Sequence, residues 1–156
     1  MKNISILALL LCVVFSSCTK KEEAPTVSSV SPEEVVRNFV SLSSQAKEAQ
    51  DKVRLSEFCQ GDMRAAFEGM TDEQFRLFYL NGNVNIKELR ITGITKDKNK
   101  ATVQYQILVE NRQGTDITHE TNEREVELSE VPNGWVIEAI RPKGTDKLIF
   151  SRGMVF

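Results

Sequence analysis

The segment from Ala101 to Arg141 constrains the fold most, because three stretches of alternating apolar and polar residues are separated there by turn sequences. Every second residue from Val103 to Val109 is apolar, a spacing that is typical of a half-buried β-strand. A second stretch runs from Ile117 to Leu128, and Pro132-Asn-Gly134 then suits a tight hairpin with positive φ. A third stretch has apolar residues at Trp135, Ile137 and Ala139. The segment therefore predicts three consecutive antiparallel strands.

A further strand is predicted directly upstream of these three. Apolar residues recur at Leu89, Ile91 and Ile94, and the polar run Lys96-Asp-Lys-Asn-Lys100 supplies the turn into the next strand. The alternation slips between Ile86 and Leu89, which predicts a β-bulge or a late start of the strand. The sheet should therefore contain about four strands.

Three helical regions are predicted before the strands. The first begins at Ser31-Pro-Glu-Glu34, a capping sequence with proline at the first helical position, and its apolar stripe extends to about Gln50. The second covers Leu55 to Phe67, with an interruption at Gln60-Gly61-Asp62. The third begins with the capping box Thr71-Asp-Glu-Gln74. Helices followed by strands predict an α+β domain, with N-terminal helices packed on one face of a curved antiparallel sheet.

The third helical region is rich in aromatic residues, and two interpretations of them are open. They line a ligand pocket, or they belong to the hydrophobic core. Helical spacing favours the core, because aromatic residues in such a pattern are usually buried. The residues concerned are Phe75, Phe78 and Tyr79.

Several of these segments resemble a known fold family. They are Ser31-Pro-Glu-Glu-Val-Val-Arg-Asn-Phe39, the strand that begins Ala101-Thr-Val, the hairpin after it and Gly134-Trp-Val-Ile137. Together they resemble small bacterial lipoproteins with a nuclear-transport-factor-2-like (cystatin-like) domain. The resemblance implies a cone whose mouth can bind small molecules, in a superfamily that includes isomerases and dehydratases as well as binding domains.

The first residues have the composition of a secretory signal. Lys2 gives a positive start, and a short apolar run from Ile4 to Phe15 is followed by Ser16-Ser17-Cys18. Small residues directly before a cysteine resemble the lipobox of bacterial lipoproteins, in which that cysteine is acylated and becomes the first mature residue. Cys18 is thus the predicted lipidation site, the alternative being an ordinary cleaved signal. Under the enterobacterial sorting rule, the residue Thr19 instead of aspartate favours the outer membrane.

These features divide the chain into a signal peptide at 1–17, a flexible polar tether at 18–30, an α+β domain at 31–141 and an apolar C-terminal extension at 142–156. The 20 basic and 22 acidic residues give a formal charge of −2. A protein that neutralises phosphates needs a basic field, so nucleic acid is not an expected partner. The expected partners are the membrane, through the lipid, and a small-molecule or protein ligand.

Two further features concern single segments. Cys59 is the one cysteine expected in the mature domain, and we expect it to be a buried apolar residue, the alternative being a reactive thiol. The end of the sequence is apolar, and we expect it to be covered either by the domain itself or by a partner that accepts a strand. Its apolar residues are Leu148, Ile149, Phe150, Met154, Val155 and Phe156.

Few residues of the domain are candidates for chemistry. His119 is the only histidine, which excludes a histidine-pair metal site, and alternation places it on the solvent face. The opposite face of that strand carries Asn122 and Arg124, which would lie at a cavity rim and orient a polar ligand, as arginine does with carboxylates. Tyr105 on the preceding strand completes this candidate binding set. We identify no catalytic residue, metal ligand or cofactor motif.

The sequence favours a membrane-anchored extracytoplasmic lipoprotein with a non-enzymatic domain that binds a ligand or a protein. The alternative is a small cone-fold enzyme, isomerase or hydrolase-like, that uses a carboxylate such as Glu120 or Asp62 as its base. Trp135 is expected to be a core residue under either hypothesis.

Overall fold

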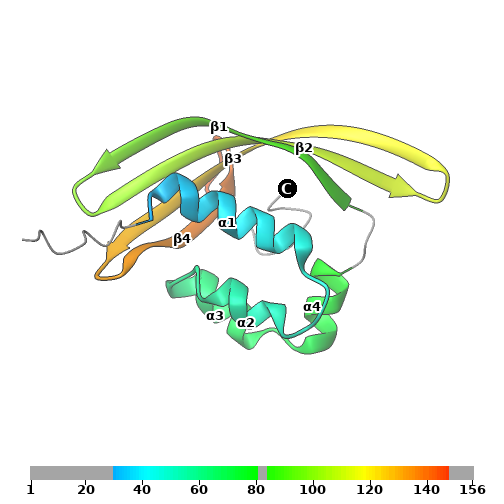
Figure 1. The fold of residues 1–156 in the computed structure, drawn as a ribbon, viewed down its shortest axis with the longest axis horizontal. Coiled ribbons are helices and arrows are strands. Elements are labelled where there is room, and N and C mark those ends of the chain that lie inside the picture. Colours follow the sequence, from blue (N-terminus) through cyan, green and yellow to red (C-terminus); the bar gives the residue numbers. More distant parts are fainter. Residues whose placement is uncertain (1–29, 81–83, 148–156) are drawn as a thin grey trace, which may run out of the picture.

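The computed structural model of the protein describes residues 30–80 and 84–147. Within these ranges, helices precede strands, and the strands form a curved sheet that arches over the helices (Figure 1). The predicted signal peptide, Cys18 and the apolar residues from Leu148 onward lie outside the described residues. The elements are α1 (Pro32–Gln45), α2 (Asp51–Ser56), α3 (Gly61–Gly69), α4 (Asp72–Tyr79), β1 (Val84–Asp97), β2 (Lys100–Gln113), β3 (Asp116–Val131) and β4 (Gly134–Pro142).

The strands form one antiparallel sheet in the order β1-β2-β3-β4, as the alternation predicts. Gly114 has a φ of 63° at the β2–β3 turn, a conformation that glycine adopts without strain. The predicted irregularity in β1 is confirmed, since the register shifts between Ile86 and Glu88, and a second shift follows between Ile91 and Gly93. The α+β prediction is therefore confirmed.

The alternation predicted for the last strand is wrong beyond Ile137. Leu128 pairs with Ile137 but Glu127 pairs with Ala139, so that β4 has one extra residue at this point. Such a bulge reverses the side to which the following residues point. Ile140 therefore joins Val126 in the core cluster and is fully buried, while Ala139 is also buried, at 3% exposed, but lies outside that cluster.

The first helix is shorter than predicted. It begins as expected, with the Glu34 amide donating to the Ser31 hydroxyl, but it ends at Gln45, and Ala46 has left the helical conformation with a ψ of 126°. The carboxylate of Asp51 accepts hydrogen bonds from the Lys47 and Glu48 amides at 2.9 and 3.2 Å. These bonds stabilise a turn where the apolar spacing predicted further helix.

The start of α4 confirms the predicted capping box, because Thr71 and Gln74 exchange hydrogen bonds. Phe75 and Tyr79 are fully buried and stack with ring centroids 4.8 Å apart. Phe78, in contrast, is 42% exposed. The interpretation of the aromatic residues as core is therefore confirmed for two of the three residues and wrong for Phe78, which points away from the packed face.

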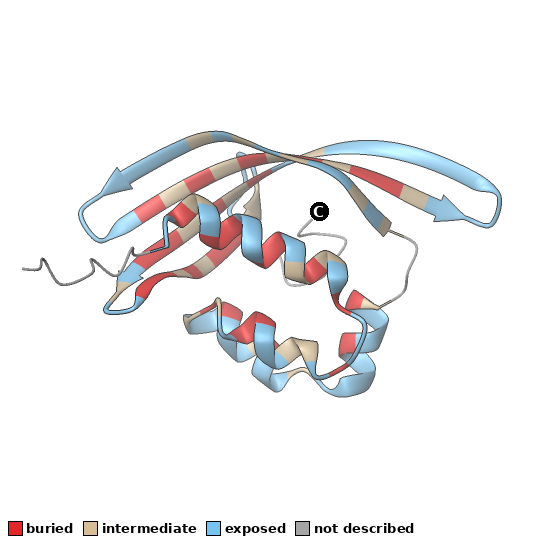
Figure 2. Ribbon diagram, viewed as in Figure 1, coloured by how far each residue is buried: buried red, intermediate tan, exposed pale blue. Residues whose placement is uncertain are grey.

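The core lies between the sheet and the helices, and buried residues recur along α1, β2, β3 and β4 (Figure 2). Phe39 of α1 lies at its centre, with edge-to-face contacts to Phe58 and Phe67. Trp135 is 9% exposed, so its assignment to the core is confirmed. Cys59 is buried too, and burial raises the pKa of its thiol to about 12. The expectation of a buried cysteine is thereby confirmed.

The segment between α2 and α3 closes part of the outer edge of β4. The Ile137 amide donates to the Phe58 carbonyl at 2.8 Å, and the Gln60 amide donates to the Ile137 carbonyl at 2.9 Å. Cys59 thus forms an isolated parallel bridge with Ile137. These bonds attach the helices to the edge of the sheet. In the ranges 30–80 and 84–147, no helix has both the length and the apolar character needed to span a membrane.

Candidate binding surface on the concave face of the sheet

The strand register places the predicted binding residues on one face of the sheet. Tyr105 of β2 pairs with Arg124 of β3, and Ile107 pairs with Asn122. Directly paired residues of antiparallel strands point to the same side. Because Tyr105 and Ile107 are core residues, this side is the concave face, which the helices cover in part. The candidate set predicted from the sequence therefore shares one surface.

Arg124 and Tyr105 form the buried part of this surface. Arg124 is 9% exposed and Tyr105 is 1% exposed. A guanidinium Nη1 of Arg124 donates to the Glu123 carbonyl at 3.1 Å. Burial lowers the pKa of the guanidinium, and burial also raises the pKa of the Tyr105 hydroxyl, against the opposing effect of the nearby Arg124 charge. Arginine keeps its charge in proteins, so this surface contains a largely desolvated cation.

The β1 side of the concave face is apolar and partly exposed. In the register, Ile91 lies opposite Tyr105 and Leu89 lies opposite Ile107. Further along, β1 and the β2–β3 hairpin extend past the end of α1 (Figure 1). The half-buried apolar residues that β1 contributes are Val84, Ile86, Leu89 and Ile91. We call these four residues together with Asn122 and Arg124 the concave surface.

The two carboxylates considered as catalytic bases lie apart. Glu120 pairs with Val109 and is exposed on the concave side of β3. Asp62 is exposed at the start of α3, beside a cavity of about 450 Å³ at the outer edge of β4. That cavity is also lined by Glu138, whose pKa is lowered mainly by a hydrogen bond from Lys100. The structure therefore keeps Glu120 and Asp62 apart.

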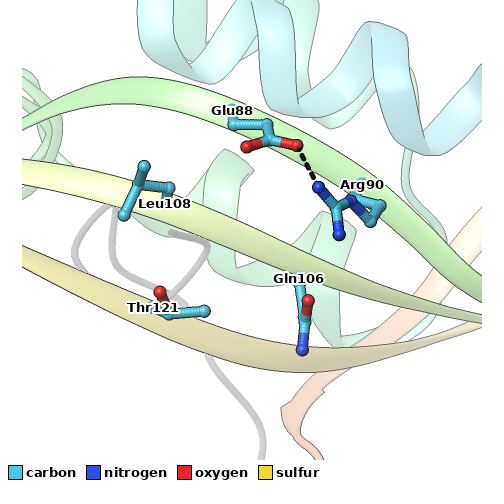
Figure 3. A pocket seen from close by; sticks show the side chains of 5 residues that line it. All are labelled: Glu88, Arg90, Gln106, Leu108 and Thr121. Carbon is cyan, nitrogen blue, oxygen red and sulfur yellow. Dashed lines mark hydrogen bonds and ion pairs between the residues drawn. The ribbon is translucent and has the colours of Figure 1, made fainter.

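The convex face of the sheet is polar, and many of its side chains form hydrogen bonds or ion pairs with one another. A hollow of about 200 Å³ lies on β1, β2 and β3. Figure 3 shows the side chains that line it, among which Arg90 donates to Glu88 at 2.8 Å. The Gln106 amide, also at this hollow, donates to Glu123 at 2.8 Å. Leu108 and Thr121 complete the lining. Polar side chains that satisfy one another leave little apolar area for a ligand.

His119 lies on the exposed convex side, as predicted. Its Nε2 is 3.6 Å from Glu110 of the neighbouring strand. Glu110 also forms ion pairs with Lys87 at 2.9 Å and Arg112 at 2.8 Å. Hydrogen bonds from these two cations hold the pKa of Glu110 at about 2. Sequence reasoning missed this cluster, because its members come from three strands.

Metal ligation finds no support in the part of the chain that the structure describes. No group of three or more histidine, cysteine, aspartate or glutamate side chains in residues 30–80 and 84–147 is arranged to hold a metal ion.

Comparisons with known proteins support the fold. No protein-family model and no curated protein matches this sequence. The structure is similar to a SEC-C motif containing protein from Rhodopseudomonas palustris, with a TM-score of 0.54 and 13% identity over 72% of this chain and 79% of that chain. It is also similar to the intermembrane space region of the chloroplast protein ARC6, with a TM-score of 0.53 and 13% identity over 70% of this chain and 92% of that chain.

An NTF2-like protein with a cystatin-like fold from Novosphingobium aromaticivorans is also among the similar structures. Its TM-score is 0.47, at 15% identity over 72% of this chain and 80% of that chain. Identities this low show a shared fold alone, so function has to be argued from the surface itself.

Proposed function

We propose that this protein is a lipoprotein of the cell envelope whose domain binds an organic anion with an apolar part, without catalysing a reaction. The observation that supports binding is the concave surface, where the desolvated guanidinium of Arg124 lies across the sheet from half-buried apolar side chains of β1. The composition of the first 18 residues supports the anchor. In an envelope with two membranes, the outer membrane is the favoured location.

The chemistry of the surface supports this ligand class. The electrostatic attraction between an anionic group and a cation is stronger in a partly desolvated site than in water, because the effective dielectric constant of the site is lower. Arginine also offers a planar fork of donors that matches a carboxylate. The apolar residues of β1 would hold the apolar part of the same molecule, as side chains do in most ligand sites.

A direct test uses 4-(trifluoromethyl)benzoate as the probe and follows its ¹⁹F signal with the full-length protein in detergent. The probe should bind the wild type, and Arg124→Gln should weaken binding about tenfold or more, since a hydrogen bond to a charged group is lost. Arg90→Gln on the convex face is the matched control and should bind as the wild type does. Equal binding by the two variants would refute the proposed surface.

The anchor has a separate test. Wild-type protein should partition into the detergent phase of a Triton X-114 extraction, because an acyl chain gains about 0.8 kcal/mol for each methylene group that it buries. Cys18→Ser removes the acylated thiol and should shift the protein into the aqueous phase. Unchanged partitioning of the variant would contradict lipidation at Cys18.

A further inference from the structure

We infer that two copies of this protein associate through β1, pairing the outer edges of their β1 strands antiparallel about a two-fold axis at Leu89. The contact would join the sheets of the two copies into one continuous sheet. This association does not depend on the proposed function, because it uses the edge of the sheet and not the face that carries Arg124.

β1 is a long edge strand. In the order β1-β2-β3-β4, it has a strand neighbour on one side only. Its 14 residues contain no proline, and strands of globular proteins are usually only about 5–6 residues long. Among the residues that the structure describes, no backbone hydrogen bond from outside the sheet reaches β1, whereas the α2–α3 connection closes part of the other edge at Ile137. The outer edge of β1 thus offers a row of backbone donors and acceptors to a further strand.

The apolar side chains of β1 are less covered than their partners on β2. Leu89 is half-buried, but Ile107 opposite it is fully buried. Ile94 is 45% exposed, but Val103 opposite it is fully buried. A strand added beside β1 would cover Leu89 and Ile94 further and so remove apolar area from water.

The two bulges of β1 let a second copy match both faces of the strand. The register shifts leave Lys87 and Thr92 as the extra residues. With the axis at Leu89, Val84 lies opposite Ile94 of the second copy, and both residues are on the concave side. The bulges lie nearly symmetrically about the axis, so that each one faces the bulged part of the other strand. The concave and convex sides of the two strands therefore stay in phase along the pairing.

The charges of β1 favour this register. Glu88 lies opposite Arg90 of the second copy, and the two-fold symmetry repeats the pair. Both side chains are on the convex side, are 54% and 66% exposed, and form an ion pair within the strand at 2.8 Å. An axis at Arg90 instead would set two arginines opposite each other, which is destabilising. Charge complementarity thus points to a second copy of this chain as the occupant of the edge.

The first experiment reads the register by cross-linking the full-length protein with a short bismaleimide. Leu89→Cys should give a covalent dimer, because directly opposite residues have Cβ atoms about 4.5–5.5 Å apart. Ile94→Cys is the matched control on the same face, since the two copies of position 94 would lie roughly 30 Å apart along the paired strands. It should give no dimer, although Ile94 is the more exposed of the two residues. Equal cross-linking of the two variants, or of neither, would overturn the pairing.

The second experiment reverses the charges and measures the dimer dissociation constant by analytical ultracentrifugation of the full-length protein in detergent. Glu88→Lys and Arg90→Glu should each weaken dimerisation about tenfold or more, because each places two like-charged pairs across the axis. The double variant Glu88→Lys, Arg90→Glu should recover the wild-type constant. Glu73→Lys, the same change at an exposed position of α4, is the control and should leave the constant unchanged.

The two experiments together keep the inference open to refutation. A wild type that stays monomeric at every concentration, or a double variant that fails to recover dimerisation, would overturn the association through β1. If a single charge reversal prevents folding, as read by circular dichroism, the cross-linking of Leu89→Cys still decides, because that variant keeps both charges.

Discussion

Substitution of Phe39 by alanine tests whether the packing between α1 and the other helices holds the domain together. Phe39 is fully buried, and its ring lies 6.1 Å from that of Phe58 and 6.2 Å from that of Phe67, both edge to face. A buried phenylalanine replaced by alanine usually costs about 3–5 kcal/mol. Each aromatic pair adds about 0.5–1.5 kcal/mol beyond its buried area. Because the measured cost of such substitutions already includes lost aromatic contacts, we expect a loss at the upper end of that range, about 4–5 kcal/mol, in the free energy of unfolding.

Phe78→Ala is the matched control, because the same side chain is removed from a position that is 42% exposed. It should cost less than about 1 kcal/mol. Urea unfolding followed by circular dichroism gives both values, and the denaturant slope should stay the same in the two variants. A loss below about 2 kcal/mol for Phe39→Ala, or losses that are equal in the two variants, would refute the assignment of the core.

Three further predictions follow from buried or charged groups. Trp135→Ala should cost about 3–5 kcal/mol by the same measurement, and a cost under about 1 kcal/mol would contradict its burial. Because the pKa of the Cys59 thiol is about 12, iodoacetamide should leave Cys59 unmodified in the folded protein at pH 8 and modify it after denaturation, as read by mass spectrometry. The pKa of Glu110 falls from 4.5 to about 2 on folding, so the stability it contributes is present above pH 4.5 and is lost as the pH falls toward 2. Glu110→Gln should therefore lose less stability than the wild type between pH 5 and pH 2, and parallel losses would exclude this role.

The parts of the fold that depend on neighbouring residues could be predicted from the sequence. The cap at Ser31 and the capping box at Thr71 need only residues within one helical turn, and both are present. Strand alternation also placed Tyr105, Asn122 and Arg124 on one face, because period-2 geometry fixes the side of each residue. Whether this face binds a ligand stays a prediction.

The parts that depend on distant residues could not be predicted. The extra residue at Glu138 follows from how β4 pairs with β3, and nothing in the local alternation marks it. The end of α1 is set by Asp51, whose carboxylate competes with the helix for backbone amides. Lys87 and His119 reach Glu110 from β1 and β3, so that the full cluster exists only once the sheet has formed.

The bonds between the α2–α3 connection and Ile137 have a consequence for the order of folding. Phe58 and Gln60 are joined to a residue almost eighty positions further along the chain. As the chain is synthesised, the helical half emerges first and has to wait for the last strand before it can close against the edge of the sheet. A chain interrupted before β4 would keep Phe39, Phe67 and their neighbours accessible to chaperones. These two bonds therefore make the closure of the helical half against the sheet edge a non-local step that needs the last strand.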